Sequence, residues 1–531
     1  MMRSVLGIGG GLAADRVTYS GGVTHLNVTK GVRDGLPYRN SSGQGSVKYS
    51  VTPQISLSGR IWASNGYLAA TESPIVTKAE ILANVPASGP VRAIPLSLDQ
   101  LARYEQNRSQ PLAAGEATYI PSQIDPDGRR MYEFLNGMVT LQHQVAPALS
   151  YRVAYQGLNT SRSSIDGSAG PGQFEPSSIS RSQFDGHTHT LQSRADYRAG
   201  AHNHITFGYE FEHEQYFSFN NDVRSNSTDL RQRSHAVFAQ NQISLVDGQL
   251  QIIAAGRVQA FSVLAPTFNG LTPGPYQGVA ILNPPTAYTG DGALAYFFRG
   301  IQTKLRAHVG NSFRAPSGYE RLGPFGDPRL RPERAISVDG GIDQWLLGSK
   351  LQLTATAFYT KLQETVRFVT LPAGDPFARR SGYGNGGGGI ARGIELSGRL
   401  APTSTTSVQT AYTYTNSDSL LPTIGTTYYK NLGLSDHMFT LTTTQRFARH
   451  FNVTFDLYAL SAYSLQSLFG REYVFDPPVR GDVVFHYDRP ILNDKTLELY
   501  TKVENVFNKR AFEDGFVGPK AWATAGLRVK Y

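Results

Sequence analysis

Cysteine is absent from the 531 residues of the sequence, which excludes a disulfide framework, a thiolate metal site and a thiol nucleophile. Charge is also scarce, because Asp, Glu, Lys and Arg make up only 17% of the chain, against about a quarter in an average soluble protein. No stretch approaches the roughly 18 apolar residues that a membrane helix needs. The mean hydropathy of −0.29 still allows membrane strands, since only every second residue of such a strand faces lipid.

Residues 1–7 lack the charged segment, apolar core and small-residue cleavage site of an export signal. If the protein is exported, we therefore expect the sequence to be incomplete at its start. The net charge is +9, and no run of five or more basic residues occurs. This dispersed charge argues against a nucleic-acid partner and suits lipopolysaccharide phosphates or an anionic ligand.

The clearest pattern present is an alternation of apolar and polar residues with period two. In residues 301–309 the odd positions are mostly apolar, from Ile301 to Val309, while the even positions, from Gln302 to His308, are polar. The same alternation occurs in residues 205–212, 351–359, 451–457 and 497–504. With their flanks these runs reach about ten residues, enough to cross a bilayer as tilted strands, whereas soluble strands usually stop near five or six.

The connections between these runs are of two kinds, short turns and long polar segments, and the longest segment is 65–130. Short turns on one side and long loops on the other are typical of a transmembrane antiparallel up-and-down β-barrel, so we predict an all-β fold with residues 1–531 as one domain. The count is about 21 strands, the first near 4–14. Since bacterial single-chain barrels have even counts, we expect one further strand before Met1, giving about 22.

Four segments in the C-terminal two-fifths of the chain form an ordered series of motifs. They are Asn311-Ser312-Phe313-Arg314-Ala315-Pro316 with Tyr319-Glu320 and Asp327 to Arg334, then Arg392-Gly393-Ile394-Glu395-Leu396, then Val503 to Lys509, and last Gly526 to Tyr531. This series resembles the motifs of TonB-dependent outer-membrane receptors. The matching positions, to which the resemblance assigns structural roles, are Phe313, Arg314, Pro316, Pro332, Glu333, Arg392, Gly393, Glu395, Asn505, Phe507 and Tyr531.

The resemblance implies a monomeric 22-stranded barrel in the bacterial outer membrane, filled by an N-terminal plug and surrounded by lipid and lipopolysaccharide. It implies uptake of a ferric siderophore, vitamin B12, another metal chelate or an oligosaccharide, without enzymatic activity or a resident cofactor. Counterparts of the signal peptide, TonB box, plug and first strand are absent from this sequence. The TonB–ExbB–ExbD system is therefore expected as a partner only if those segments exist. A plugless passive pore and a non-functional fragment remain alternatives.

Aromatic and basic residues in the predicted loops are the candidates for ligand contact. They are Tyr67, Arg92, Tyr104, Arg108, Tyr319, Arg321, Tyr383, Tyr428 and Tyr429. Within the long loop, Ser97 is a suitable cap for a short helix. No resident metal is predicted, although His187, His189 and His213 would offer imidazole ligands if a hairpin turning at 199–201 placed His187 opposite His213. The glycine run 382–389 lacks the Lys-Ser/Thr of a phosphate loop and is predicted as an external loop.

Overall fold

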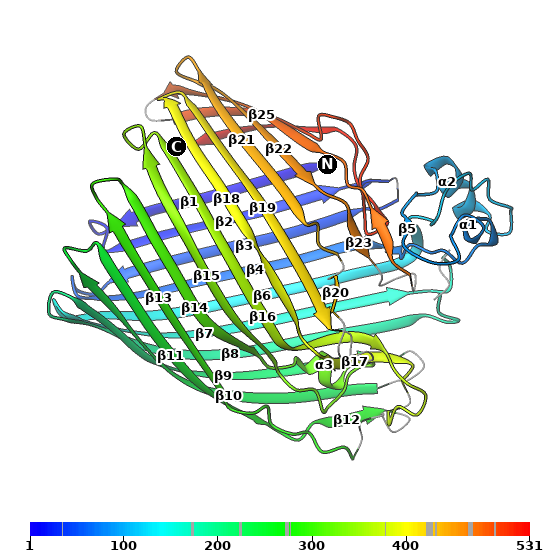
Figure 1. Cartoon of the computed structure of the whole chain (residues 1–531), viewed down its shortest axis with the longest axis horizontal. Helices are drawn as coiled ribbons and strands as arrows, with labels where there is room; N and C mark the ends of the chain where they lie inside the picture. The colour runs from blue at the N-terminus through cyan, green and yellow to red at the C-terminus, as the bar shows by residue number, and fades with distance from the viewer. Residues whose placement is uncertain are drawn as a thin grey trace.

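The computed structural model describes residues 1–33, 35–170, 175–221, 226–270, 276, 278–377, 379–420, 428–430, 433–465, 471–492 and 495–530. A single sheet of 24 strands accounts for most of them, and it curls into the wall of a barrel (Figure 1). Three of the 24 strands are short extensions, namely β12 (Thr267–Gly270), β17 (Ser381–Gly386) and β20 (Tyr428–Lys430). The remaining 21 strands form the wall itself, which confirms the predicted fold and strand number.

The wall strands follow one another in chain order, each antiparallel to the next. They are β1 (Met2–Leu12), β2 (Val17–Val28), β3 (Tyr38–Ser50), β4 (Ile55–Glu72), β6 (Gln123–Ala146), β7 (Leu149–Asp166), β8 (Ser180–Ala199), β9 (Asn203–Asn220), β10 (Asn226–Leu245), β11 (Leu250–Val263), β13 (Ala287–Phe298), β14 (Thr303–Arg314), β15 (Glu333–Leu346), β16 (Leu351–Thr370), β18 (Gly389–Thr403), β19 (Thr406–Leu420), β21 (His437–Phe447), β22 (Phe451–Leu460), β25 (Arg480–Leu492), β26 (Lys495–Glu504) and β29 (Trp522–Lys530).

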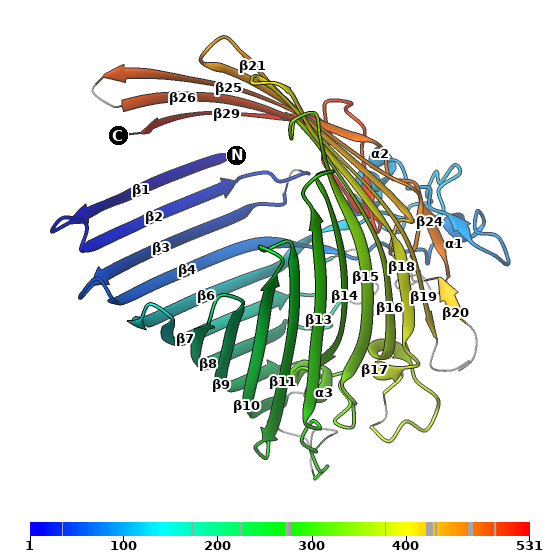
Figure 2. The same cartoon turned by 60° about the vertical axis from the view of Figure 1, so that its left-hand side comes forward.

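The first and last strands of the wall are its two edges. Within the described residues, β1 pairs with β2 and β29 pairs with β26, but no ladder joins β1 to β29. Because the direction alternates along an odd number of strands, both edge strands run the same way, as their arrowheads show in Figure 2. The two edges therefore lack the antiparallel relation that every other neighbouring pair in the wall has.

The two faces of the wall differ as the alternation predicts. On one face Val309, Val338 and Tyr359 lie side by side across β14, β15 and β16, and all three are exposed. On the opposite face His308 hydrogen-bonds Asp339 across the same strands, at 2.8 Å. The first face, called the outer face below, suits lipid, and the second, the inner face, lines the lumen.

Three short helices and two small sheets lie outside the wall. They are α1 (Ala79–Leu82), α2 (Leu98–Gln106) and α3 (Gly318–Leu322), a sheet of β5 (Val91–Arg92), β23 (Tyr463–Leu465) and β24 (Tyr473–Phe475), and a pair of β27 (Phe512–Glu513) and β28 (Phe516–Val517). Ser97 caps α2 by accepting a hydrogen bond from Gln100 N, as predicted. No helix in the described part of the chain has the length and apolar character required to cross a bilayer.

The long connections all leave one end of the wall, called the loop end below, and the tight turns lie at the other (Figure 1). The longest connection spans residues 73–122 and not the predicted 65–130, because β4 and β6 continue pairing beyond the apolar part of the wall. The prediction that the glycine run 382–389 is an external loop is also partly wrong, since residues 381–386 form strand β17, which pairs with β16. Polar strand extensions carry no alternation of hydropathy, so the sequence does not mark where they end.

Glycine is required at one motif position for a steric reason. Gly393 lies in β18 between its register partners Phe358 and Thr415, and a Cβ added there would overlap the Tyr414 carbonyl oxygen and come within 2.7 Å of the Phe358 ring. The glycine of the Arg-Gly-Ile-Glu motif thus allows an aromatic ring to cover the backbone of the neighbouring strand.

We expect Gly393→Ala to destabilise the barrel by about 1–3 kcal/mol, because the methyl group forces a backbone shift. Gly137→Ala in β6 is the matched control, since a Cβ there would have no neighbour within 4 Å. Urea unfolding in lipid vesicles, followed by gel mobility of unheated samples, measures both effects. Equal unfolding midpoints for the two variants would contradict the steric account.

Candidate ligand-binding site at the loop end

Residues 73–122 fold into a compact unit, called the loop subdomain, together with the pair β23–β24. Its two apolar clusters contain the fully buried Ile81, Leu101 and Ile120 in one and Val91 with Tyr473 in the other. A single connecting loop rarely buries so many apolar side chains. The long segment is therefore a folded unit and not an extended connection.

The loop subdomain joins segments from opposite ends of the chain. Strand β5 pairs in parallel with β24, with Val91 N donating to Glu472 O at 2.8 Å and Ala93 N to Val474 O at 2.9 Å. Tyr473 donates its hydroxyl to Thr118 O at 3.1 Å. These bonds connect the connection after β4 to the one after β22, so the subdomain bridges the two halves of the wall on the side where β1 and β29 are unpaired.

Three of the predicted ligand contacts belong to the loop subdomain and a fourth, Tyr67, lies in the preceding strand β4, but the four do not converge. Tyr67 lies on the outer face between Arg39 and Met131, and Tyr104 is part of the buried core of α2. Arg92 is exposed in β5, while the backbone carbonyl of Arg108 accepts from Lys78 Nζ at 2.7 Å. These positions indicate that Tyr67 and Tyr104 have mainly structural roles.

A second group, around α3, does bring predicted contacts together. The Tyr319 and Tyr383 rings lie 6.0 Å apart, edge to face. Tyr319 also contacts Phe184 at 5.5 Å, and Tyr383 contacts Phe368 at 5.5 Å. Phe184 lies on the inner face, because its neighbours in the register continue the inner rows of β7 and β9. These four rings are called the aromatic cluster, and its end formed by Phe184 and Tyr319 lies at the mouth of the lumen.

The local sequence explains why Tyr319 is held firmly. Ser317 caps α3 through a capping box, in which its hydroxyl accepts from Glu320 N and the Glu320 carboxylate accepts from Ser317 N. Arg314 then binds Glu320 at 2.9 Å and Glu333 at 2.5 Å. The hydrogen bonds and charges of those two carboxylates raise the pKa of Arg314, so this motif pair fixes the start of β15 beside α3. Pro316 and Pro332 restrict the flanking backbone.

The rings that complete the aromatic cluster were missed by sequence reasoning. Phe184 comes from β8 and Phe368 from β16, and neither stands in a recognisable motif. Only the pairing of distant strands places them beside Tyr319. Burial raises the pKa of Tyr319 and of Tyr383, so both phenols are neutral hydrogen-bond donors at physiological pH.

Among the described residues, the group with metal-ligand spacing consists of carboxylates and not of the predicted histidines. Ligand atoms of Glu72, Asp125 and Asp166 all lie within 4.8 Å of one another, at the outermost ends of β4, β6 and β7 and beyond the apolar part of the wall. Burial and the nearby Glu175 and Asp125 carboxylates raise the pKa of Glu72 to about 7. Burial and Asp125 likewise raise the pKa of Asp166 to about 6. Strands β4, β6 and β7 are neighbours in the wall, but the three residues are far apart in the sequence, so no local motif marks the group.

The histidines lie on the outer face. His189, not His187, is opposite His213, because Ala199 pairs with Asn203 and the hairpin turns one residue later than predicted. The His189 ring hydrogen-bonds the Tyr155 hydroxyl at 2.8 Å, and the His187 ring bonds Asn159 at 2.8 Å. The expected opposition of His187 and His213 is therefore wrong.

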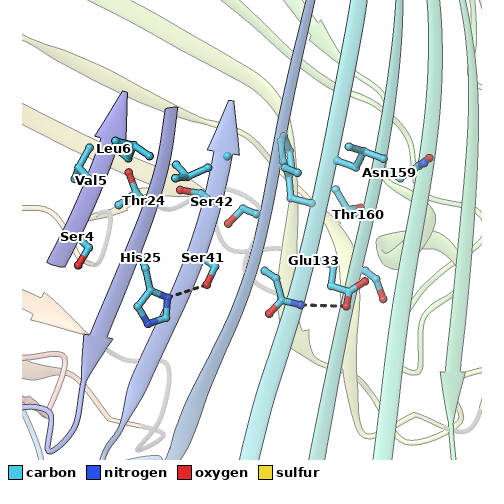
Figure 3. A pocket seen from close by; sticks show the side chains of 18 of the residues that line it. Ser4, Val5, Leu6, Thr24, His25, Ser41, Ser42, Glu133, Asn159 and Thr160 are labelled. Carbon is cyan, nitrogen blue, oxygen red and sulfur yellow. Dashed lines mark hydrogen bonds between the residues drawn. The ribbon is translucent and has the colours of Figure 1, made fainter. Parts of the chain in front are cut away.

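A groove of about 940 Å³ crosses β1–β4 and β6–β8 on that same outer face (Figure 3). Its side towards the loop end is polar, with His25 bonded to Ser41 at 2.9 Å and Asn65 to Glu133 at 3.2 Å. Its other side carries apolar residues such as Leu6. The groove thus follows the boundary between polar and apolar parts of the wall and faces away from the lumen.

The remaining motif residues have local partners where the structure describes them. Asn505 is 1% exposed and organises the last connection, with Nδ2 donating to the carbonyls of Lys509 at 2.5 Å and Pro519 at 3.1 Å. Arg392 donates to Asn416 at 3.3 Å from β18, and the Phe507 ring packs near Gly481. Tyr531 lies outside the described residues, and for Tyr428 and Tyr429 only the backbone of β20 is described.

The fold and the ordered pairing define the class, an up-and-down β-barrel of the outer-membrane type. A family model described as "TonB dependent receptor-like, beta-barrel" matches residues 93–505. The chain therefore belongs to the TonB-dependent receptor family, whose members are outer-membrane transport receptors and not enzymes. No curated protein matches the sequence.

Three solved structures illustrate the similarity of fold. One is FpvA of P. aeruginosa bound to a heterologous pyoverdine, at 13% identity and TM-score 0.70, covering 99% of this chain and 70% of its own. A second is the ferric-catecholate import receptor Fiu from K12 E. coli, at 12% identity and TM-score 0.69, covering 99% of this chain and 80% of its own. A third is BauA, the ferric preacinetobactin receptor from Acinetobacter baumannii, at 12% identity and TM-score 0.69, covering 99% of this chain and 77% of its own. At these identities the likeness shows the fold alone.

The bridge made by the loop subdomain is testable by cross-linking, since the chain has no cysteine of its own. Arg92 and Val474 are direct partners in the β5–β24 ladder. Neighbouring strands lie roughly 4.8 Å apart, which suits the Cα separation of roughly 4.4–6.8 Å that a disulfide needs. We expect the Arg92→Cys, Val474→Cys double variant to form an intramolecular disulfide that shifts its non-reducing gel mobility. Single variants serve as controls, and a double variant that stays reduced under mild oxidation would refute the bridge.

Proposed function

We propose that the protein takes up a scarce ligand, a ferric siderophore, vitamin B12, another metal chelate or an oligosaccharide, across the bacterial outer membrane. The aromatic cluster at the mouth of the lumen is the observation that supports this most, because it presents Tyr319 and Tyr383 from rigid elements to anything entering from the loop end. Neutral phenols and aromatic faces bind large, partly apolar chelates by area and hydrogen bonds. In this proposal the barrel is a monomer whose outer face contacts lipid and lipopolysaccharide.

Energy for release of the ligand into the lumen would come from the TonB–ExbB–ExbD system acting on a plug and TonB box. Those segments are a prediction from the family and would precede Met1. The part played by the described barrel is passive: it supplies the apolar outer wall, the polar lumen wall and the binding surface at the loop end.

A passive pore is the second candidate. The observation in its favour is the polar inner face, where Arg257 binds Glu210 at 2.6 Å and His308 lies between Asp291 and Asp339. Such a lining supports water and ion passage. The two functions differ in energy dependence, because a pore conducts without proton-motive force, and a non-functional fragment would give neither uptake nor conductance.

Uptake of labelled ferric siderophores by iron-starved cells that do or do not express the protein tests the proposal. We expect accumulation that requires the protein and stops when a protonophore dissipates the proton-motive force. Accumulation that persists with the protonophore, together with ligand-independent conductance in planar bilayers, would instead establish the pore.

We expect Tyr319→Ala to weaken binding of the transported ligand about twofold to tenfold, because an aromatic contact contributes roughly 0.5–1.5 kcal/mol. Tyr359→Ala is the matched control, since Tyr359 is exposed on the outer face of β16 and cannot meet a ligand in the lumen. Equilibrium binding to whole cells at 4 °C gives both affinities without transport. An unchanged affinity in Tyr319→Ala would remove the aromatic cluster from the binding site.

A further inference from the structure

Two arginines are almost fully buried in the connections around α3, and their surroundings differ sharply. Arg379 and Arg321 are 5% and 2% exposed. Both lie near an apolar group formed by Leu230, Tyr276, Leu322 and Phe377. A buried guanidinium costs several kcal/mol unless charge and hydrogen bonds compensate it, so the partners of each arginine indicate what the site is built to hold.

Arg379 is compensated within the chain. Its Nη2 binds Asp375 at 2.9 Å and Asp327 at 3.3 Å, and Nε donates to Asp375 at 3.1 Å. Nη1 donates to the carbonyl of Phe325 at 3.3 Å. Burial acts to lower its pKa, but the hydrogen bonds and charge of Asp375 outweigh that effect and raise it. Arg379 is therefore a structural ion pair.

Arg321 has no such compensation. Its Nη2 donates to the Leu282 carbonyl at 2.5 Å, while Nε and Nη1 have no hydrogen-bond partner and no carboxylate pairs with it among the described residues. Burial alone lowers its pKa. Since guanidinium cannot discard its charge at physiological pH, the three N–H donors on Nε and Nη1 of a fixed cation remain to be satisfied.

We propose that Arg321 is the anchor of an oxyanion-binding site beside α3, which takes the carboxylate or phosphate group of a small anion. Guanidinium donors match the oxygens of both groups in geometry and charge. Arg321 is two residues from Tyr319, and side chains at that spacing on a helix do not face each other. The oxyanion site is therefore separate from the aromatic cluster, and it does not depend on the proposed uptake function.

Capping and packing hold the site in place before any anion arrives. Tyr276 donates its hydroxyl to the carbonyls of Gly323 at 3.1 Å and Gly326 at 2.6 Å, directly after α3. Ser317 fixes the first turn of the same helix. With both ends of α3 held, the Arg321 side chain has little freedom to swing out to solvent. Its unsatisfied donors are therefore better satisfied by an anion that binds at the buried guanidinium than by movement of the guanidinium into water.

Inorganic phosphate and citrate, titrated separately into the purified full-length protein at constant ionic strength, test the proposal through the midpoint of thermal unfolding. We expect each anion that fits to raise the midpoint saturably in the wild type. In Arg321→Met the rise should disappear or need about tenfold to a hundredfold more anion, as expected for loss of charge-assisted hydrogen bonds. Without added anion Arg321→Met should unfold at the same temperature or higher, because it removes an uncompensated buried charge.

Arg329→Gln is the control for unspecific charge effects, because Arg329 belongs to the same connection but is exposed and bound to Asp327 at 2.8 Å. It should keep the saturable rise. If the wild type shows no saturable rise with either anion, or if Arg329→Gln loses it as fully as Arg321→Met, the proposal is wrong. Arg321→Lys, which keeps the charge, should retain a weakened rise and serves if Arg321→Met fails to fold.

Uptake by Arg321→Met then separates two sources of the oxyanion. Loss of uptake together with the phosphate effect assigns the site to an acidic group of the transported ligand. Loss of the phosphate effect alone assigns it to a free anion. Both results support the oxyanion site. Loss of uptake in Arg321→Met while phosphate still raises the unfolding midpoint would show that Arg321 does not bind the oxyanion.

Discussion

Pairing of the backbone governs the whole structure. A chain that crosses a bilayer must satisfy each N–H and C=O internally, since lipid offers no partners. The 21 wall strands meet this demand through antiparallel ladders that run in chain order. Alternation of side chains follows from the same geometry, because each strand must present one face to lipid and one to the lumen. The low charge content and the absence of long apolar runs are consequences of this single constraint.

The same constraint makes the seam between β1 and β29 the weakest part of the wall. Both edges run in the same direction (Figure 2), and no ladder joins them within the described residues. The loop subdomain ties the connection after β4 to the one after β22 through β5 and β24. Buried Val91 and Tyr473 give this tie an apolar core. The bridge thus restrains the loop end where the wall itself supplies no hydrogen bonds.

Alternation of hydropathy was sufficient to predict the strands, because it reports directly which residues face lipid. The wall strands, their number and the short turns all follow from it, as in β14 and β16. It could not predict the ends of β4 and β6 or the existence of β17, since polar extensions above the lipid do not alternate. A one-residue error in the turn at 200–202 was enough to exchange His187 for His189 opposite His213.

The candidate site was predictable only in part for a related reason. Tyr319, Arg321 and Tyr383 stand out as aromatic or basic residues in predicted loops, but their neighbours come from remote strands. Phe184 and the Glu72–Asp125–Asp166 group depend on strand order and register. Arg321 is buried among connections that are far apart in the sequence, since its Nη2 donates to the Leu282 carbonyl. None of these relations leaves a local mark in the sequence.

The orientation of the barrel is the central claim, because uptake requires the loop subdomain to face the outside of the cell. Single cysteines introduced at exposed Ser88, in the loop subdomain, and at exposed Gln54, in the turn between β3 and β4, test it in intact cells. A membrane-impermeant maleimide should label Ser88→Cys in intact cells and Gln54→Cys only after the outer membrane is opened. The reverse pattern, or equal labelling of both positions in intact cells, would contradict the account.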